Sequence, residues 1–272
     1  MLEDILFSLS ALAALLPSAF VALRRRDGGR GEEGRDGIFW LTLAVAVAGP
    51  LVWVFVKMSG TWQTGLSTTL WVTIAASMIV FATITVLNDK AWRLTPLMIP
   101  YMAVLALFAI IWQQAPESRP LAEIPGGWMQ AHILISVSTY ALVTIAAVAA
   151  LAAFLQERAL KSKQPTSLTR QLPSVAESES LLVRLLIIGE IVLGMGLATG
   201  MAAQYQETGA FIEWDHKAIL SLITFAVIGI LLIAHFSTGT RGRRITRLVL
   251  LAYLLLTLGY PGVKFVTDVL IG

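Results

Sequence analysis

Residues 132–154, HILISVSTYALVTIAAVAALAAF, contain no Asp, Glu, Lys or Arg. About 20 residues of helix, at ~1.5 Å per residue, cross the ~30 Å hydrocarbon core of a bilayer. This stretch is therefore long enough to span a membrane. Comparable apolar runs recur along the chain, so the sequence predicts an all-α integral membrane protein, a bundle of about eight transmembrane helices in a single polytopic domain, residues 1–272. The runs are about 5–23, 38–57, 68–87, 96–113, 131–155, 183–204, 216–236 and 246–268.

The overall composition supports the same fold class. Of the 272 residues, 57% are hydrophobic and only 14% are charged, and the mean hydropathy is +0.76. A soluble domain carries about 25% charged residues. The predicted spans leave little room for a soluble domain, and backbone polar groups in lipid must be satisfied within helices.

The basic residues predict the orientation of the bundle. Sixteen of the 20 Lys and Arg residues lie in or beside odd-numbered loops. Because cytoplasmic loops are enriched in Lys and Arg, we expect these loops in the cytoplasm and both termini outside. The first run has acids before it and arginines after it, the reverse of a signal peptide, which predicts an uncleaved anchor. The basic excess is then a membrane-surface feature, and no nucleic-acid partner is expected.

The absence of cysteine and of known catalytic motifs excludes several kinds of functional site. The chain has no cysteine, which excludes disulfides, iron–sulfur clusters and covalent haem attachment through Cys-x-x-Cys-His. It also has no Ser-His-Asp spacing, phosphate-binding loop or metalloprotease motif, so no catalytic residue is assigned.

The longest polar stretch, QERALKSKQPTSLTRQLPSVAESES, spans residues 156–180. Its Pro, Ser and Gln content predicts a mobile cytoplasmic linker, with ERALKSK continuing the fifth helix out of the membrane.

Tryptophans gather on the predicted outer side. The simplest interpretation is an interfacial belt, since indoles favour the headgroup region. The alternative is an aromatic platform for a planar ligand. The outer set is Trp53, Trp62, Trp71, Trp112, Trp128 and Trp214.

Two of the three histidines begin predicted helices at the outer membrane edge. His132 follows Trp128 by four residues and His216 follows Trp214 by two. Paired imidazoles suit a transition metal or a haem iron, and haem is the better hypothesis because zinc favours further Cys, His or carboxylate ligands. A quinone fits the same pattern, and the alternative is two solvated polar residues.

The third histidine lies at the other end of the seventh span. His235 follows His216 by 19 residues, or ~28 Å of helix, so one haem cannot contact both. It would belong to a second, inner haem site, with Arg243 and Arg244 for the propionates. The alternative is a histidine stabilised by the helix dipole.

Two acidic residues stand out. Glu190 lies inside the sixth predicted span, and an intramembrane acid usually forms a pair or carries protons; an ion pair with an inner-loop basic residue is the favoured interpretation. Asp215, in the stretch FIEWDHKAIL (residues 211–220), stands where an acid also stabilises a helix N-terminus.

The second half of the chain resembles a known family. WMQAHILISVSTYAL is similar to the Trp…His…Tyr-Ala element of the CcsA-type cytochrome c assembly proteins. EWDHKAILSLITFAVIGILLIAHFSTGTRGRR is similar to a reduced form of their Trp-rich outer loop and the following span. The blocks LPSVAESESLLVRLLIIGEIVLGMGLATG and LGYPGVKFVTDVLIG are closer to the HemX/YpjD-like branch. The resemblance covers about residues 128–272 and only loosely the first half.

The resemblance implies haem b as the cofactor and haem handling or delivery in a bacterial inner membrane, with haem, the lipid bilayer and other cytochrome assembly subunits as partners. It implies His132 as an outer ligand, His235 as an inner ligand, and Trp214 with Asp215 as part of the Trp-rich motif. Where the family has a second outer histidine this chain offers Tyr260, so His216 or Tyr260 would have to substitute. The alternative function is a non-catalytic accessory or regulatory subunit that kept the fold without a working haem site.

Overall fold

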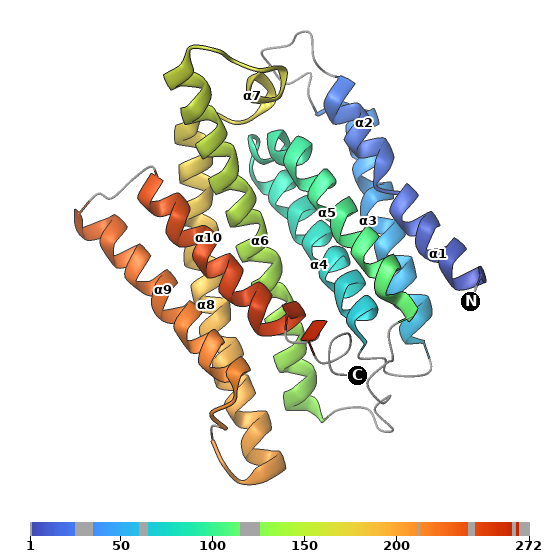
Figure 1. Ribbon diagram of the computed structural model, residues 1–272, viewed down its shortest axis with the longest axis vertical. Coiled ribbons are helices and arrows are strands. Elements are labelled where there is room, and N and C mark those ends of the chain that lie inside the picture. The colour runs from blue at the N-terminus through green and yellow to red at the C-terminus, as the bar shows by residue number, and fades with distance from the viewer. Residues whose placement is uncertain are drawn as a thin grey trace.

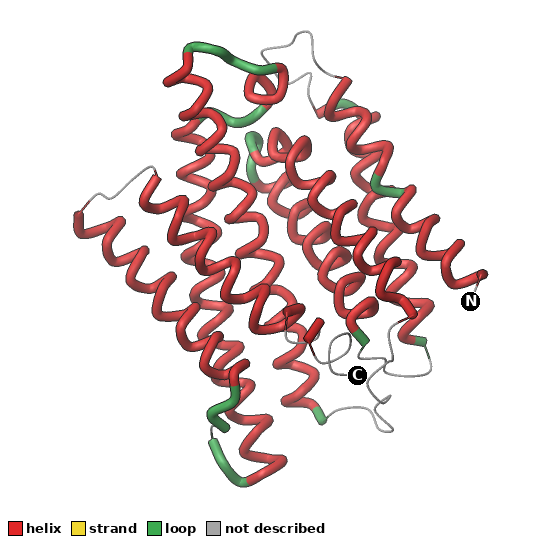
Figure 2. The backbone as a smooth tube through the Cα atoms, viewed as in Figure 1, coloured by secondary structure: helices red, strands yellow, loops and turns green. Residues whose placement is uncertain are grey.

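The computed structural model describes residues 2–24, 35–59, 65–114, 126–211, 213–238, 243–262 and 265–266. Within these ranges all regular structure is helical (Figures 1 and 2), and the predicted all-α membrane fold is confirmed. The elements are α1 Leu2–Ala13, α2 Leu16–Arg24, α3 Gly37–Met58, α4 Leu66–Leu87, η2 Ala91–Leu94, α5 Thr95–Ile111, η3 Trp112–Gln114, α6 Gly127–Ser162, α7 Ser167–Gln171, α8 Val175–Thr208, α9 His216–Thr238, α10 Arg243–Thr257 and η4 Leu258–Gly262.

Seven of the eight predicted runs coincide with segments long and apolar enough to cross a membrane. The eighth run contains α10, which has 15 residues and continues into η4, a turn of π-helix. Helices α6 and α8 have 36 and 34 residues, or roughly 54 and 51 Å at 1.5 Å per residue. They therefore extend beyond the hydrocarbon core.

The first span is built from two helices. Pro17 has no N–H, and its ring clashes with the carbonyl four residues earlier, so α1 ends at Ala13 and α2 begins at Leu16. Helix α3 lies very close to this break, because a Cβ on Gly49 would be only 2.5 Å from the Cβ of Ala14.

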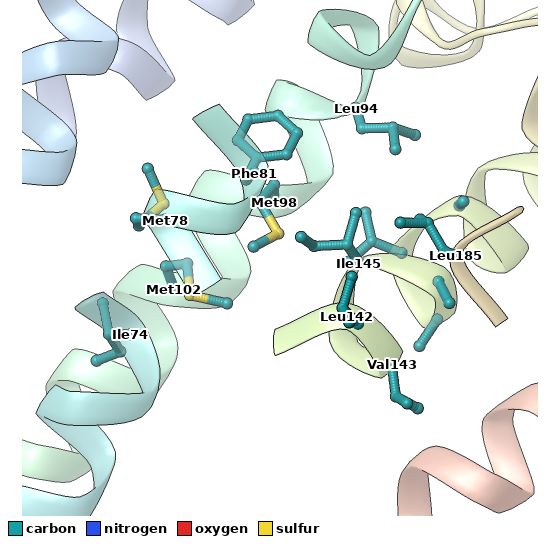
Figure 3. Close-up of a cluster of buried hydrophobic side chains, with 14 of the residues drawn as sticks. Ile74, Met78, Phe81, Leu94, Met98, Met102, Leu142, Val143, Ile145 and Leu185 are labelled. Carbon is teal, nitrogen blue, oxygen red and sulfur yellow. The ribbon is translucent and has the colours of Figure 1, made fainter. Parts of the chain in front are cut away.

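The helices form two groups (Figure 1). Helices α1 to α5 make one group, and α6, α8, α9 and α10 make the other, where α6 and α9 each pack along both α8 and α10. Helix α4 joins the groups by packing on α3, α5 and α6. The contact between the two groups is filled by apolar side chains, and Met98 of α5 points toward Ile145 of α6 (Figure 3).

Two of the tryptophans do not form an interfacial belt. Trp53 of α3 and Trp71 of α4 are fully buried and stacked, with ring centroids 5.1 Å apart. Trp53 Nε1 donates to Ser8 Oγ (2.9 Å), and Ser8 donates to Gln113 Oε1 (2.9 Å). The belt interpretation is wrong for this pair, because their rings pack inside the first helix group.

The segment after α6, predicted to be a mobile linker, is hydrogen-bonded to the rest of the protein. As predicted, α6 continues through residues 157–162. Beyond it, Gln156 Nε2 lies 2.6 Å from the carbonyl oxygen of Thr169 and 3.1 Å from those of Leu172 and Pro173. Arg93 Nε donates to the carbonyl of Gln171 (3.0 Å). These bonds hold α7 and the residues beside it against the ends of α6 and η2. The polar composition of this segment did not predict these contacts.

Candidate functional site

His132 lies in the second turn of α6 and is held against α8. Its Nδ1 is 2.9 Å from the carbonyl oxygen of Gly196. A carbonyl can only accept, so Nδ1 carries the proton and Nε2 is the nitrogen with a free lone pair. The same carbonyl accepts from Thr199 Oγ1 (3.1 Å). This arrangement fixes the tautomer and the ring orientation, as a backbone carbonyl does for metal-bound histidines.

The imidazole fits against α8 because Gly200 has no side chain. A Cβ at Gly200 would be 2.9 Å from Cε1 of His132 and 3.1 Å from Nδ1. On the other side of the ring, Nε2 has Ser136 Oγ at 3.5 Å, which is at the outer limit for a hydrogen bond. Nε2 is therefore the atom of His132 most available to a ligand.

Trp128 stands one turn before His132. Residues four apart lie on the same helix face, so the indole and the imidazole are neighbours along α6. The Trp128 side chain is 48% exposed, which leaves an aromatic surface beside the histidine. The role predicted for Trp128 beside a haem ligand stays a prediction.

The start of α9 has a structural explanation of its own. Asp215 Oδ1 accepts from the backbone N–H of Ala218 (2.8 Å), the bond of an N-terminal helix cap. His216 is the first residue of α9 and is exposed, and the Trp214 side chain is 72% exposed. The side chain of Lys217 lies outside the described residues. The crowding of polar residues in EWDHK thus marks a capped helix start.

The helices that carry His132 and His216 pack on different faces of α8. Gly194 of α8 meets Phe225 of α9, and Gly229 of α9 meets Glu190 of α8. Continuing this antiparallel register places His216 opposite residue 203 of α8, three residues beyond Gly200 and so ~4.5 Å further along that helix. The two histidines lie at similar depth, but α6 and α9 each pack along α8 and α10 rather than along one another.

His235 lies near the C-terminal end of α9. It continues the face of Thr224, Ile228 and Leu231, which are all buried, and its ring meets Phe236 edge-on at 5.2 Å. It is partly buried. Arg243 and Arg244 open α10 at the same end, but their side chains lie outside the described residues.

Tyr260 is placed only through its backbone. It lies in η4, directly after α10, and its side chain is outside the described residues. The preceding Gly259 packs on Leu220 of α9, since a Cβ there would be 3.4 Å from that of Leu220. This puts η4 at the end of the second helix group where α9 begins, level with the first turns of α9.

The order of these elements is that of a known family. A family model described as "Cytochrome C assembly protein" matches residues 41–271. The chain belongs to this family. The predicted family is confirmed, and the match reaches further into the first half than the quoted motifs do.

One curated relative matches along the whole chain. An uncharacterized 28.8 kDa protein of Azospirillum brasilense is 56% identical over all 272 residues of both chains. The inner membrane protein YpjD of Escherichia coli is 28% identical over 69% of each chain. The cytochrome c biogenesis protein CcsA of Gloeobacter violaceus is 26% identical over 63% of this chain and 52% of its own. No solved structure matches.

These likenesses settle the class and the location. The chain is a cytochrome c biogenesis-like, multi-pass protein of the inner membrane. YpjD appears by name among the relatives, while the HemX part of the predicted branch stays a prediction.

Sequence reasoning missed the partners of His132 on α8. Gly196 and Gly200 are the first and last residues of the stretch GLATG, and their spacing does predict a close helix contact. The residues of that stretch do not indicate that the helix packed against them contributes the imidazole of His132, 64 residues earlier in the chain. Ser136 was missed for the same reason, since a serine four residues from a histidine is common in any helix.

Proposed function

We propose that this family member binds haem b at the outer end of its second helix group and handles or delivers it, without forming covalent bonds to it. We take residues 1–272 as a single membrane domain for this task. The observation that carries the proposal is the bond from His132 Nδ1 to the Gly196 carbonyl, which leaves Nε2 as an iron ligand.

The residues around His132 are of the types that bind haem. Haem iron accepts an axial imidazole nitrogen, and His132 offers one whose orientation is set by α8. Trp128 adds an exposed aromatic surface one turn away. Close to His132, the outer turns of α6 are only partly buried or exposed, whereas residues 139–150 are fully buried. The outer end of α6 therefore leaves side-chain surface for a ligand.

The second outer ligand would come from α9 or η4. His216 is exposed at a similar depth on α9, and Tyr260 lies in η4; imidazole and tyrosinate both bind haem iron. His235 would serve a separate inner site with Arg243 and Arg244. In this proposal Trp214 contributes apolar surface, and Asp215 acts chiefly by capping α9. Other cytochrome assembly subunits would take the haem onward.

One observation favours the alternative of an accessory subunit without a haem site. The carboxylate of Asp215 is occupied by the Ala218 N–H, and Trp214 is largely exposed. These two residues of the Trp-rich motif thus have a helix-capping and surface placement that needs no cofactor.

The test is the absorption spectrum of the purified, dithionite-reduced protein, with haem quantified per chain. His132→Ala should remove most of the bound haem, and His216→Ala should remove it only if His216 is the second ligand. Gly200→Ala, which would push the ring of His132, should lower haem content, whereas Gly127→Ala should not, because no atom lies within 4 Å of a Cβ there. A wild-type protein without haem, or a His132→Ala variant with full haem, would favour the accessory-subunit function.

A further inference from the structure

Glu190 is an acid in the middle of the membrane. It lies 15 residues into α8, and Gly229, its neighbour on α9, is close to the midpoint of that helix. Side chains that ionise at such a depth are costly and are retained for a pairing or a function. The proposed haem site at the outer end makes no use of this residue.

The carboxyl group of Glu190 faces α9. Its Oε1 is 3.1 Å from the position that a Cβ on Gly229 would occupy. Its Oε2 is buried and has no hydrogen-bond partner among the described residues. The ion pair predicted for Glu190 is likewise not found among the ion pairs of the described residues.

Other titratable groups near this depth are directed elsewhere. On α6, Tyr140 lies close to the same level, but its hydroxyl contacts Tyr253 and Thr257. On α9, the described titratable residue on the inner side is His235, six residues beyond Gly229 and so ~9 Å further along the helix. On α10, Arg247 is exposed, and α10 packs on α6 and α9.

We propose that Glu190 is a proton-binding site at the contact between α8 and α9. The carboxyl is neutral while α9 lies against α8, and it ionises when water enters this contact. The physical reason is that an ionised carboxylate without a partner loses its hydration and gains nothing in return, whereas the protonated acid is a small neutral group that fits beside a glycine.

The position of α9 makes this site sensitive to conformation. Only 17% of the apolar stretch of α9 is buried inside the protein, the smallest share among the seven candidate spans. Helix α9 also forms an edge of the bundle in Figure 1. Separating α9 from α8 would expose the carboxyl without disturbing the more enclosed α6. Binding or release of one proton would then be linked to the α8–α9 contact.

The test uses a lipid-soluble carbodiimide on the full chain in vesicles, followed by peptide mass spectrometry. A protonated carboxyl adds across the carbodiimide: its oxygen bonds to the central carbon, its proton goes to a nitrogen, and the acyl group then shifts to nitrogen as a stable N-acylurea. We expect labelling of the peptide that contains Glu190 at neutral pH, loss of labelling at high pH, and none in Glu190→Gln.

Two glycine variants provide a matched pair at the same contact. Gly229→Ala places a methyl group against Oε1 of Glu190, so it should change the pH at which labelling is half-maximal. Gly194→Ala meets only the ring of Phe225, at 3.4 Å, so it should leave that pH unchanged.

An infrared difference spectrum between wild type and Glu190→Gln checks the protonation state without the reagent. A carboxylic acid band at neutral pH supports the proposal. A carboxylate band at neutral pH, or labelling that is the same in wild type and Glu190→Gln, overturns it.

Discussion

At the scale of single residues, a chain of hydroxyl groups joins the two helix groups. Tyr140 of α6 lies 3.2 Å from the hydroxyls of Tyr253 and Thr257 on α10, and Tyr253 also bonds to Tyr101 of α5. Thr257 donates its one proton to the backbone carbonyl of Tyr253 (2.8 Å), so it must accept from Tyr140. The donors then run from Tyr101 through Tyr253 and Tyr140 to Thr257.

This direction makes Tyr140 the central link and gives a stability prediction. Tyr140→Phe removes the acceptor for the Tyr253 hydroxyl proton and the donor to Thr257 Oγ1, which should lower the free energy of unfolding by about 1 kcal/mol. Thermal unfolding in detergent measures it. Tyr205→Phe is the control, because that ring is half-exposed and keeps its stacking on Phe211. Equal stability of the Tyr140 variant and wild type would mean that the hydroxyl chain contributes nothing.

At the scale of helices, Asp215 at the start of α9 has two possible roles, as a helix cap and as part of a functional motif. The side chain of Asp215 caps the helix through an accepting oxygen, and an asparagine can do the same without the charge. The family resemblance assigns the same residue to an outer motif. Substitutions that separate the oxygen from the charge therefore distinguish the two roles.

We expect Asp215→Ala to lower the free energy of unfolding by about 1 kcal/mol, the usual effect of losing a cap, and Asp215→Asn to leave it nearly unchanged. Differential scanning fluorimetry of the detergent-solubilised protein measures both. Glu213→Ala, two residues earlier and exposed, is the matched control. If asparagine is as harmful as alanine, the charge matters and capping is not the main role.

At the scale of the whole molecule, the orientation decides which compartment His132 faces. The basic loops predict that the turn between α8 and α9 is outside and the turn between α6 and α7 is cytoplasmic. The chain has no cysteine, so a single introduced cysteine reports its own accessibility. Gln206, in the last turn of α8, and Gln164, just after α6, are both exposed.

In intact spheroplasts, a membrane-impermeant maleimide should label Gln206→Cys at once. It should label Gln164→Cys only after the membrane is opened, because the bilayer separates the reagent from the cytoplasmic turn. The reverse pattern would invert the orientation and would place the His132 end of the bundle in the cytoplasm.

Much of the molecule follows from local sequence. The spans, the extension of α6 beyond the membrane and the family are visible in apolar runs and short motifs, because hydrocarbon forces every backbone polar group into a helix. The similar depth of His132 and His216 also follows, since both lie at the start of their spans. The stacked pair Trp53 and Trp71 does not, because composition favours tryptophan at the membrane surface and only packing shows which rings turn inward.

What the sequence by itself determined is the class of protein and the depth of each candidate residue, since both depend on the length and order of apolar segments. The tertiary structure decided which helix faces meet. It placed His132 on Gly196 and Gly200 of α8, packed α9, which carries His216, on a different face of that helix, and brought Glu190 against Gly229. Helices in lipid associate through close packing of small residues rather than through a hydrophobic drive, so these contacts depend on partners far apart in the chain that no local pattern specifies.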